Sequence, residues 1–166
     1  MQTRLRKLDE GVVDATLLAY AGLKRMDMAD EATAVLEWEE MLPAVAQGAI
    51  GIQCRDDDER ALRYIDALNH EETFTCVSCE RAFLAALDGN CKTPIAGQAQ
   101  IIDGELRFQG LVASVDGSPI YRSSKVGAPA DAEKIGREAG EEIKAEAGIE
   151  FFEWLQQQEE PAAVSA

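Results

Sequence analysis

The sequence lacks an apolar run long enough to cross a bilayer. Its longest apolar stretches, such as Ala15 to Leu23, are shorter than the roughly 20 residues that a spanning helix needs, and polar or glycine residues interrupt them. The first residues, MQTRLRKLDEG, are charged where a secretory signal needs apolar side chains. These absences predict a soluble, intracellular chain with no export signal and no membrane partner.

Positive charge is also scarce. The 16 Lys and Arg residues face 31 Asp and Glu residues, and the net charge of −15 makes a nucleic-acid partner unexpected, since phosphates would be repelled. Two local basic clusters stand out, Arg4 with Arg6 and Lys7, and Lys24 with Arg25. Arginine matches a carboxylate with two hydrogen bonds, so the clusters could bind carboxylates. A solvated helix face explains them equally well.

The chain has a single histidine, His70, which we interpret as structural or exposed. Cys76 and Cys79 have the CxxC spacing, but a structural zinc site needs four ligands, and a redox pair needs a helix N-terminus after a strand. We therefore expect buried helical thiols and no metal, with a small zinc or redox protein as the minor alternative. Without an export signal, all four cysteines are expected to be thiols (Cys54, Cys76, Cys79 and Cys91).

The length of 166 residues and the 46% hydrophobic and 28% charged composition indicate a globular chain. The first part has an α/β pattern. A helix over Thr3 to Glu10 ends at Gly11, and a second helix opens at Asp56 to Asp58, whose carboxylates favour a first turn. Short apolar segments predict strands near residues 15–21, 34–37 and 49–54.

After Asn69 the pattern becomes that of a self-contained α+β unit. A helix capped by Asn69 should run to Asp88, with a buried side made of Phe74, Val77, Leu84 and Leu87. Asp-Gly pairs then separate three strands, residues 95–102, 105–114 and 119–126, which predicts an antiparallel meander. One long helix over 131–157, bent near Gly148, should follow.

Cys91 lies in the turn Asp88-Gly-Asn-Cys-Lys-Thr-Pro, between the predicted helix and the first strand of the meander. A thiol in such a turn is accessible, and the neighbouring Lys92 favours its thiolate. From the turn alone, Cys91 is either a nucleophile or an ordinary loop cysteine.

Several strings together resemble porphobilinogen deaminase (hydroxymethylbilane synthase), and they occur in the family's order from residue 3 to about residue 155. They are Thr3-Arg-Leu-Arg-Lys-Leu-Asp, Ala21-Gly-Leu-Lys-Arg, Leu42-Pro-Ala-Val-Ala-Gln-Gly-Ala-Ile-Gly-Ile-Gln-Cys-Arg, Leu68-Asn-His-Glu-Glu-Thr, and Glu80-Arg-Ala-Phe-Leu with Gly89-Asn-Cys-Lys-Thr-Pro-Ile. The residues around the last two strings resemble those of plant and algal members. This resemblance favours the plastid stroma, with the cytoplasm as the alternative.

The resemblance implies an enzyme that joins four porphobilinogen molecules, releasing ammonia at each step, to form hydroxymethylbilane. It implies that Cys91 carries the covalent dipyrromethane cofactor through a thioether. Arg4, Gln47 and Gly48 match cofactor-binding positions, and Arg25 matches a substrate-binding arginine.

The resemblance also implies a layout. Residues 1–42 would end a periplasmic-binding-protein-like α/β domain 2, and 43–48 would be the interdomain hinge. Residues 49–66 would return to domain 1, 69–158 would form the α+β domain that carries the cofactor, and 159–166 would be a flexible tail.

The family's catalytic aspartate and Ser/Arg-rich loop belong to an N-terminal half with no counterpart here. We therefore expect no catalytic residue in this chain, and we expect the missing N-terminal half and porphobilinogen as its partners, in a monomeric parent enzyme. The alternative is a non-catalytic domain that binds carboxylated pyrroles or assembles with a separate chain.

Two residues depart from the family pattern. Ala46 stands where the family usually has glycine, in a segment whose backbone needs that freedom. Asn90 stands where many members have a second glycine before the cysteine, and Asn tolerates left-handed conformations better than most residues.

Overall fold

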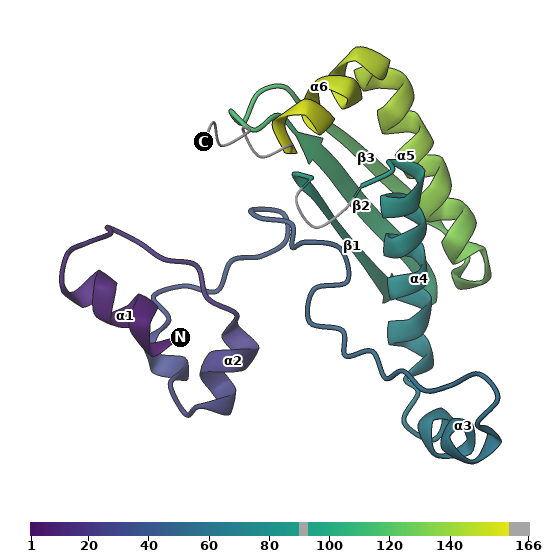
Figure 1. Ribbon diagram of the computed structural model, residues 1–166, viewed down its shortest axis with the longest axis horizontal. Coiled ribbons are helices and arrows are strands. Elements are labelled where there is room, and N and C mark those ends of the chain that lie inside the picture. Colours follow the sequence, from purple (N-terminus) through teal and green to yellow (C-terminus); the bar gives the residue numbers. More distant parts are fainter. Residues whose placement is uncertain (90–92, 160–166) are drawn as a thin grey trace, which may run out of the picture. The chain divides into compact units, whose positions relative to one another are not determined.

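The computed structural model describes residues 1–89 and 93–159. The chain divides into two compact units, Met1–Glu40 and Met41–Ala166. Figure 1 shows helices in the first unit, and helices with a three-stranded sheet in the second. Across the described residues, no helix combines the length and the apolar character that crossing a membrane would require.

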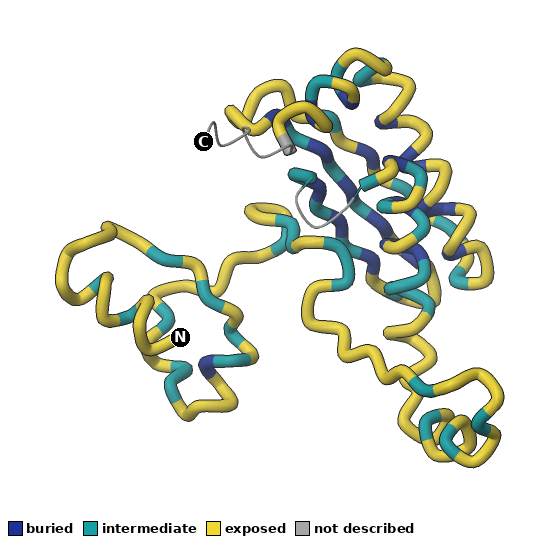
Figure 2. The backbone as a smooth tube through the Cα atoms, in the orientation of Figure 1, coloured by how far each residue is buried: buried dark blue, intermediate teal, exposed yellow. Residues whose placement is uncertain are grey.

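The first unit contains the helices α1 (Gln2–Asp9) and α2 (Tyr20–Arg25) and the short 3-10 helix η1 (Ala29–Glu31). The helix predicted from Thr3 is confirmed, and the chain leaves it through Gly11, whose φ is +69°. Leu23 is the one buried hydrophobic residue that the structure describes in this unit. Figure 2 shows the unit as almost entirely exposed or half-buried.

The strands predicted near residues 15–21, 34–37 and 49–54 are not formed. Residues 15–19, 34–37 and 49–54 have no regular structure, and Tyr20 begins α2 instead. A strand is stable only when neighbouring strands take up its backbone hydrogen bonds. The described residues offer these segments no such neighbours, so a suitable composition alone does not make them strands.

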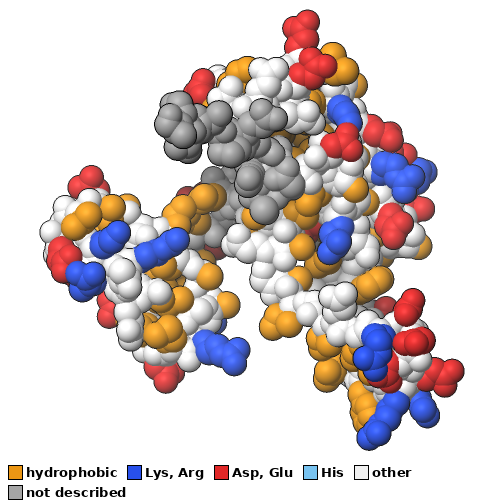
Figure 3. Space-filling view, viewed as in Figure 1, with side chains coloured by type: hydrophobic (Ala, Val, Ile, Leu, Met, Phe, Trp, Pro, Cys, Tyr) orange, Lys and Arg blue, Asp and Glu red, His pale blue; other side chains and the backbone are white. Residues whose placement is uncertain are grey.

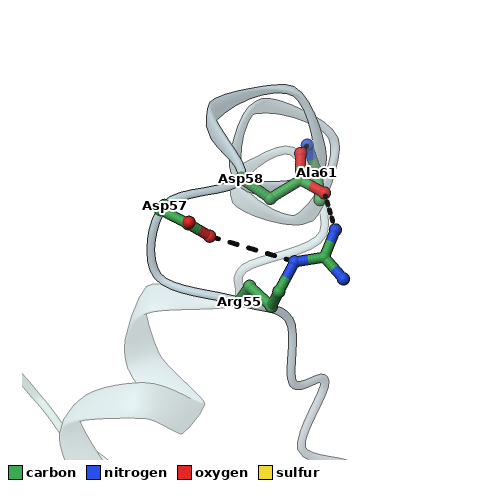
Figure 4. A network of polar contacts seen from close by, with 4 residues as sticks. All are labelled: Arg55, Asp57, Asp58 and Ala61. Carbon is green, nitrogen blue, oxygen red and sulfur yellow. Dashed lines mark hydrogen bonds and ion pairs between the residues drawn. The ribbon is translucent and has the colours of Figure 1, made fainter.

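Helix α3 (Glu59–Asp66) begins where the aspartate run predicted a helix start. The Asp58 carboxylate accepts the Ala61 backbone N–H at 2.9 Å, which satisfies one of the unpaired amides of the first turn. The Arg55 guanidinium contacts Asp57 at 3.9 Å and Asp58 at 3.4 Å (Figure 4). The cap is therefore local and solvent-facing, and α3 buries none of its described residues.

The second unit contains the predicted meander of β1 (Ile95–Ile102), β2 (Glu105–Ala113) and β3 (Ile120–Gly127). The three strands are antiparallel in the order β1-β2-β3. The first hairpin turns at Asp103 and Gly104, whose φ angles are +54° and +82°. Such angles suit an Asp-Gly pair, so the turn chemistry that predicted the hairpin also forms it.

One face of the sheet is covered by α4 (Glu71–Ala86) and α5 (Ala132–Ala147), and α6 (Ile149–Glu159) packs beyond them (Figure 1). The short helix η2 (Pro129–Asp131) leads into α5. The long final helix that we predicted is two helices, because Gly148 adopts a φ of +76° between them. The cap of α4 is His70 rather than Asn69, since the His70 ring nitrogen accepts the Thr73 N–H at 3.2 Å.

The core lies between this sheet face and the helices, where Figure 2 shows most of the buried chain. The Phe83 ring contacts Phe108 with centroids 4.9 Å apart and lies over Gly97 and Gly110, which face each other across β1 and β2. The predicted buried side of α4 is partly wrong, because Phe74 is 62% exposed. The helix instead turns Cys79 and Phe83 inward, since glycines of α5 let the two backbones approach closely on that side.

Candidate functional site

The turn that carries Cys91 connects α4 to β1. Asn90, Cys91 and Lys92 lie outside the described residues, but both ends of the turn are described. At one end Asp88 has a φ of +52°, and its carboxylate accepts a hydrogen bond from Lys144 Nζ at 2.5 Å. At the other end the Ile95 N–H donates to the Thr93 carbonyl at 2.7 Å. Asp88 is therefore bonded to α5, and Thr93 is bonded to the first residue of β1.

Cys76 and Cys79 both lie in α4, as predicted, with Cys79 fully buried and Cys76 half-buried. Burial and the nearby Glu80 carboxylate raise the pKa of the Cys79 thiol to about 12. Burial, followed by the Glu80 and Glu72 carboxylates, also raises the pKa of Cys76, although a hydrogen bond from the Ile101 backbone opposes this. Because the thiolate is the nucleophilic form, these two cysteines are poor nucleophiles near neutral pH.

Gln47 and Gly48 are the last two residues of a turn over residues 45–48, and both are exposed. The Pro43 carbonyl accepts the Gly97 N–H of β1 at 3.0 Å. Residues 43–48, which we call the linker, therefore lie along the edge of the sheet. Ala46 has a φ of +57° and Gly48 a φ of +90°. The left-handed backbone at Ala46 is the conformation for which glycine is the usual residue, so this departure from the family pattern falls on a demanding position.

Beside this turn is a hollow of about 560 Å³ in the surface of the second unit. The linker, the first turns of α4 and the outer edge of β1 line it, with polar groups from Thr73, Gln98 and Gln100 among the lining residues. The Gln47 and Gly48 turn forms one wall. The turn thus borders a polar depression, which leaves its backbone and the Gln47 amide accessible.

Arg4 and Arg25 both belong to the first unit, on α1 and at the last residue of α2. The Arg4 Nη1 donates to the Leu17 carbonyl at 3.1 Å, and Arg4 itself is exposed. Arg25 is exposed and has no ion pair with any residue that the structure describes. Gln47 and Gly48 belong to the second unit, so the structure places the predicted binding residues in two groups.

Sequence reasoning missed one residue of this region, Glu80. Its carboxylate is 4% exposed and accepts N–H groups from the linker and from β1. Burial raises its pKa, and the two backbone hydrogen bonds act in the opposite direction. Its position between Cys79 and Phe83, on the buried side of α4, could have indicated its burial. A buried carboxylate needs hydrogen-bond donors, so such a position also indicates partners in neighbouring segments.

The exposed arginines of the first unit and the exposed Gln47 amide of the second are groups that can hydrogen-bond to carboxylates. The model of the porphobilinogen deaminase dipyromethane cofactor binding domain matches residues 1–63, and the model of that enzyme's C-terminal domain matches residues 74–145. The chain belongs to the porphobilinogen deaminase family. Arg4, Arg25, Gln47 and Gly48 fall in the first match, and Cys91 falls in the second.

Individual relatives agree with this assignment. The chain is 57% identical over 160 residues to the chloroplastic porphobilinogen deaminase of Oryza sativa, covering 94% of this chain and 44% of that protein. The chloroplastic porphobilinogen deaminase of Pisum sativum is 56% identical over 155 residues, covering 92% of this chain and 42% of that protein. The porphobilinogen deaminase of the bacterium Nitrobacter hamburgensis is 47% identical over 152 residues, covering 92% of this chain and 48% of that protein. The higher identity to the two plant proteins confirms the predicted resemblance to plant members of the family. The chain spans about half the length of the curated relatives it matches.

Proposed function

We propose that this chain is the cofactor-carrying part of a hydroxymethylbilane synthase, a transferase that joins four porphobilinogen molecules with release of ammonia. The two family matches, in order over residues 1–63 and 74–145, carry this proposal. The proposed layout is the one that the resemblance implies. Residues 1–42 end domain 2, 43–48 are the hinge, 49–66 return to domain 1, and 69–158 carry the cofactor.

Cys91 is the attachment residue in this proposal. Its thiolate attacks the aminomethyl carbon of a porphobilinogen unit, so that a C–S bond forms while the C–N bond breaks and the nitrogen leaves as ammonia. Among the described cysteines, Cys76 and Cys79 are disfavoured for this step because burial raises the pKa of both thiols. Lys92, next to Cys91 in the sequence, favours the thiolate there.

The donor groups of this chain fit dipyrromethane, whose pyrroles carry acetate and propionate groups. Exposed Arg4 and Arg25 offer planar guanidinium forks to carboxylates, Arg4 for the cofactor and Arg25 for the incoming substrate. Gln47 and Gly48 offer an amide and an accessible backbone from the hinge. When attached, the dipyrromethane supplies the terminal pyrrole carbon onto which each new unit is added.

The test uses the chain joined to the N-terminal portion of the rice relative, which supplies the part that this chain does not match. After incubation with porphobilinogen, intact-mass analysis should show an increase equal to two linked pyrroles, located on Cys91 by peptide mapping. Cys91→Ser should lose the adduct completely, because a hydroxyl is far less nucleophilic than a thiolate.

Cys54→Ser is the matched control, since Cys54 is a half-buried free thiol of the same unit. It should retain the adduct. An unmodified Cys91 in the joined protein, or an adduct that survives in Cys91→Ser, contradicts the proposed function.

A second candidate function has support from the exposed apolar residues of the first part of the chain. Ile50 is 88% exposed and Leu17 is 56% exposed, and both lie in strand-like segments that form no strand. Such segments suit assembly with a further polypeptide that supplies partner strands. The chain alone would then be a non-catalytic binding or assembly domain, and turnover of porphobilinogen by the isolated 166 residues would rule this out.

The plant relatives are chloroplastic by name. We therefore propose the plastid stroma as the compartment. Import of a fluorescent fusion of the complete coding sequence into chloroplasts would test this.

A further inference from the structure

Glu80 is a buried acid whose two carboxylate oxygens serve two different segments. It lies on the inner side of α4, between Cys79 and Phe83, and is 4% exposed. Its Oε1 accepts the backbone N–H of Ala99 in β1 at 2.9 Å. Its Oε2 accepts the backbone N–H of Ala46 in the linker at 2.7 Å. One side chain therefore joins a helix, a strand and the linker.

These contacts satisfy backbone N–H groups on the edge of β1 that faces away from β2. Because β1 pairs with β2 and with no other strand that the structure describes, its other edge presents backbone N–H groups at alternate residues. The Gly97 N–H donates to the Pro43 carbonyl of the linker at 3.0 Å. The next outward-facing N–H, that of Ala99, donates to the Glu80 carboxylate. The linker is thus held against β1 at two points, directly through Pro43 and through Glu80 at Ala46.

The second point lies where the linker turns away from the sheet. Ala46 has a φ of +57°, a conformation that L-residues other than Asn, Asp and Gly seldom adopt. Gln47 and Gly48, the proposed cofactor-binding residues, follow directly and are exposed. Since Glu80 binds the N–H of the strained residue itself, it helps to hold the backbone in this conformation.

We infer that Glu80 is a positioning residue, which holds the Gln47 and Gly48 turn in the orientation that receives the carboxylate-rich cofactor. This inference rests on the proposed function. Glu80 acts through the backbone, since its two carboxylate oxygens accept the N–H groups of Ala46 and Ala99.

An ionised carboxylate is the side chain that this position needs. Both of its oxygens are acceptors, so it can satisfy two backbone N–H groups that approach from different segments. In glutamine one oxygen is replaced by an NH₂ group, which would face the N–H of Ala46 or of Ala99 without a partner. Burial raises the Glu80 pKa, so the charge has a desolvation cost at neutral pH, and stability alone gives little reason to keep it.

The experiment compares Glu80→Gln with Glu142→Gln, both in the full 166-residue chain and in the chain joined to the rice N-terminal portion. Glu142 is a control carboxylate of the same unit, and it contacts Ser123 and Lys125 on β3, at the opposite edge of the sheet from β1. In the 166-residue chain, amide exchange at Ala46 should accelerate by about tenfold or more in Glu80→Gln and remain unchanged in Glu142→Gln. In the joined protein, Glu80→Gln should lower kcat by up to about a hundredfold, the range that small displacements of positioning groups produce.

A rescue variant separates positioning from general destabilisation. Ala46→Gly removes the backbone strain that Glu80 helps to hold, so it should restore part of the kcat that Glu80→Gln loses. Because relief of this strain also stabilises the fold, urea unfolding of each variant must show an equal folded fraction under the assay conditions, so that the restored kcat reports positioning.

Equal losses in Glu80→Gln and Glu142→Gln, or unchanged exchange at Ala46, overturn the inference. If the joined wild-type protein forms no adduct on Cys91, the proposed function fails. The exchange measurement then still decides whether Glu80 holds the linker.

Discussion

The two parts of the chain differ in how they satisfy their own backbone and apolar groups. Residues 71–159 form three helices, a 3-10 turn and a sheet around one buried cluster, which includes Phe83, Phe108 and Ile143. Residues 1–68 contain only short helices among the described elements, and Leu23 is their one buried hydrophobic residue. Figure 3 shows hydrophobic side chains at the surface of the first unit.

The difference shows what a local sequence can and cannot achieve. The meander has its hairpin turns and its partner strands within about 30 residues, so its hydrogen bonds close locally. The segments at 15–19 and 49–54 are as apolar as strands, but the structure describes no neighbouring strands for them. Among the described residues, the first part of the chain therefore has a single buried hydrophobic residue, whereas the last part has its own core.

The largest effect should come from a close contact inside this core. A Cβ at Gly136 would overlap the Cys79 carbonyl oxygen, which is backbone and cannot move aside without separating α4 from α5. Gly136→Ala should lower the free energy of unfolding of the C-terminal part by about 3 kcal/mol. Trp154 lies in this part of the chain, and Trp38→Phe removes the other tryptophan. Urea unfolding monitored by the fluorescence of Trp154 then reports on the C-terminal part alone.

Gly51→Ala is the matched change in the first part of the chain. A Cβ there meets no atom within 4 Å, so the expected change is within about 0.5 kcal/mol. Equal effects of the two substitutions would mean that the two regions do not differ in packing as described.

The sequence predicted the elements whose causes are local. The Asp-Gly turns predicted the meander and the aspartate run predicted the start of α3, whereas Gly148 predicted only a bend where the structure has two separate helices. The failures have non-local causes. Strand formation near residues 49–54 requires partner strands, and the exposure of Phe74 depends on which side of α4 the glycines of α5 approach.

The candidate site was predicted in the same uneven way. Arg4, Arg25, Gln47 and Gly48 came from the family resemblance, and the structure shows that all four are exposed. Glu80 was missed because an acidic residue in a helix normally indicates a solvent-facing position. Its hydrogen-bond partners are Ala46 and Ala99, which are 34 and 19 residues away in the sequence.

A pH titration should reveal the burial of Cys79. Its folded pKa is raised to about 12, whereas an unfolded cysteine titrates near 8.5, so between these values the unfolded state loses a proton that the folded state keeps. The stability contribution is therefore complete below about pH 8.5 and is lost as the pH rises toward 12. At pH 10, wild-type protein should have lost roughly 1.5–2 kcal/mol more than Cys79→Ala, as measured by urea unfolding at pH 8 and pH 10.

Cys76→Ala provides the graded comparison for this titration. Cys76 is only half-buried and its pKa is also raised, so its removal should reduce the pH dependence in the same direction but by less. If Cys79→Ala keeps the full wild-type pH dependence, the Cys79 thiol is not shielded from solvent in the folded protein.

The smallest effect should come from an ion pair at the surface. Lys144 Nζ lies 2.5 Å from the Asp88 carboxylate, and the two side chains are 43% and 71% exposed. Lys144→Met should therefore cost less than about 1 kcal/mol of stability.

The same pair joins the end of α5 to the start of the turn that carries Cys91. Its loss should slow formation of the Cys91 adduct by about two- to threefold. Timed intact-mass measurements on the joined protein give this rate. Arg55→Met is the control from the first part of the chain, because Arg55 pairs with Asp58 at 3.4 Å at the start of α3 and supports only that helix start. If Arg55→Met slows the adduct as much as Lys144→Met does, the ion pair has no particular part in holding the turn.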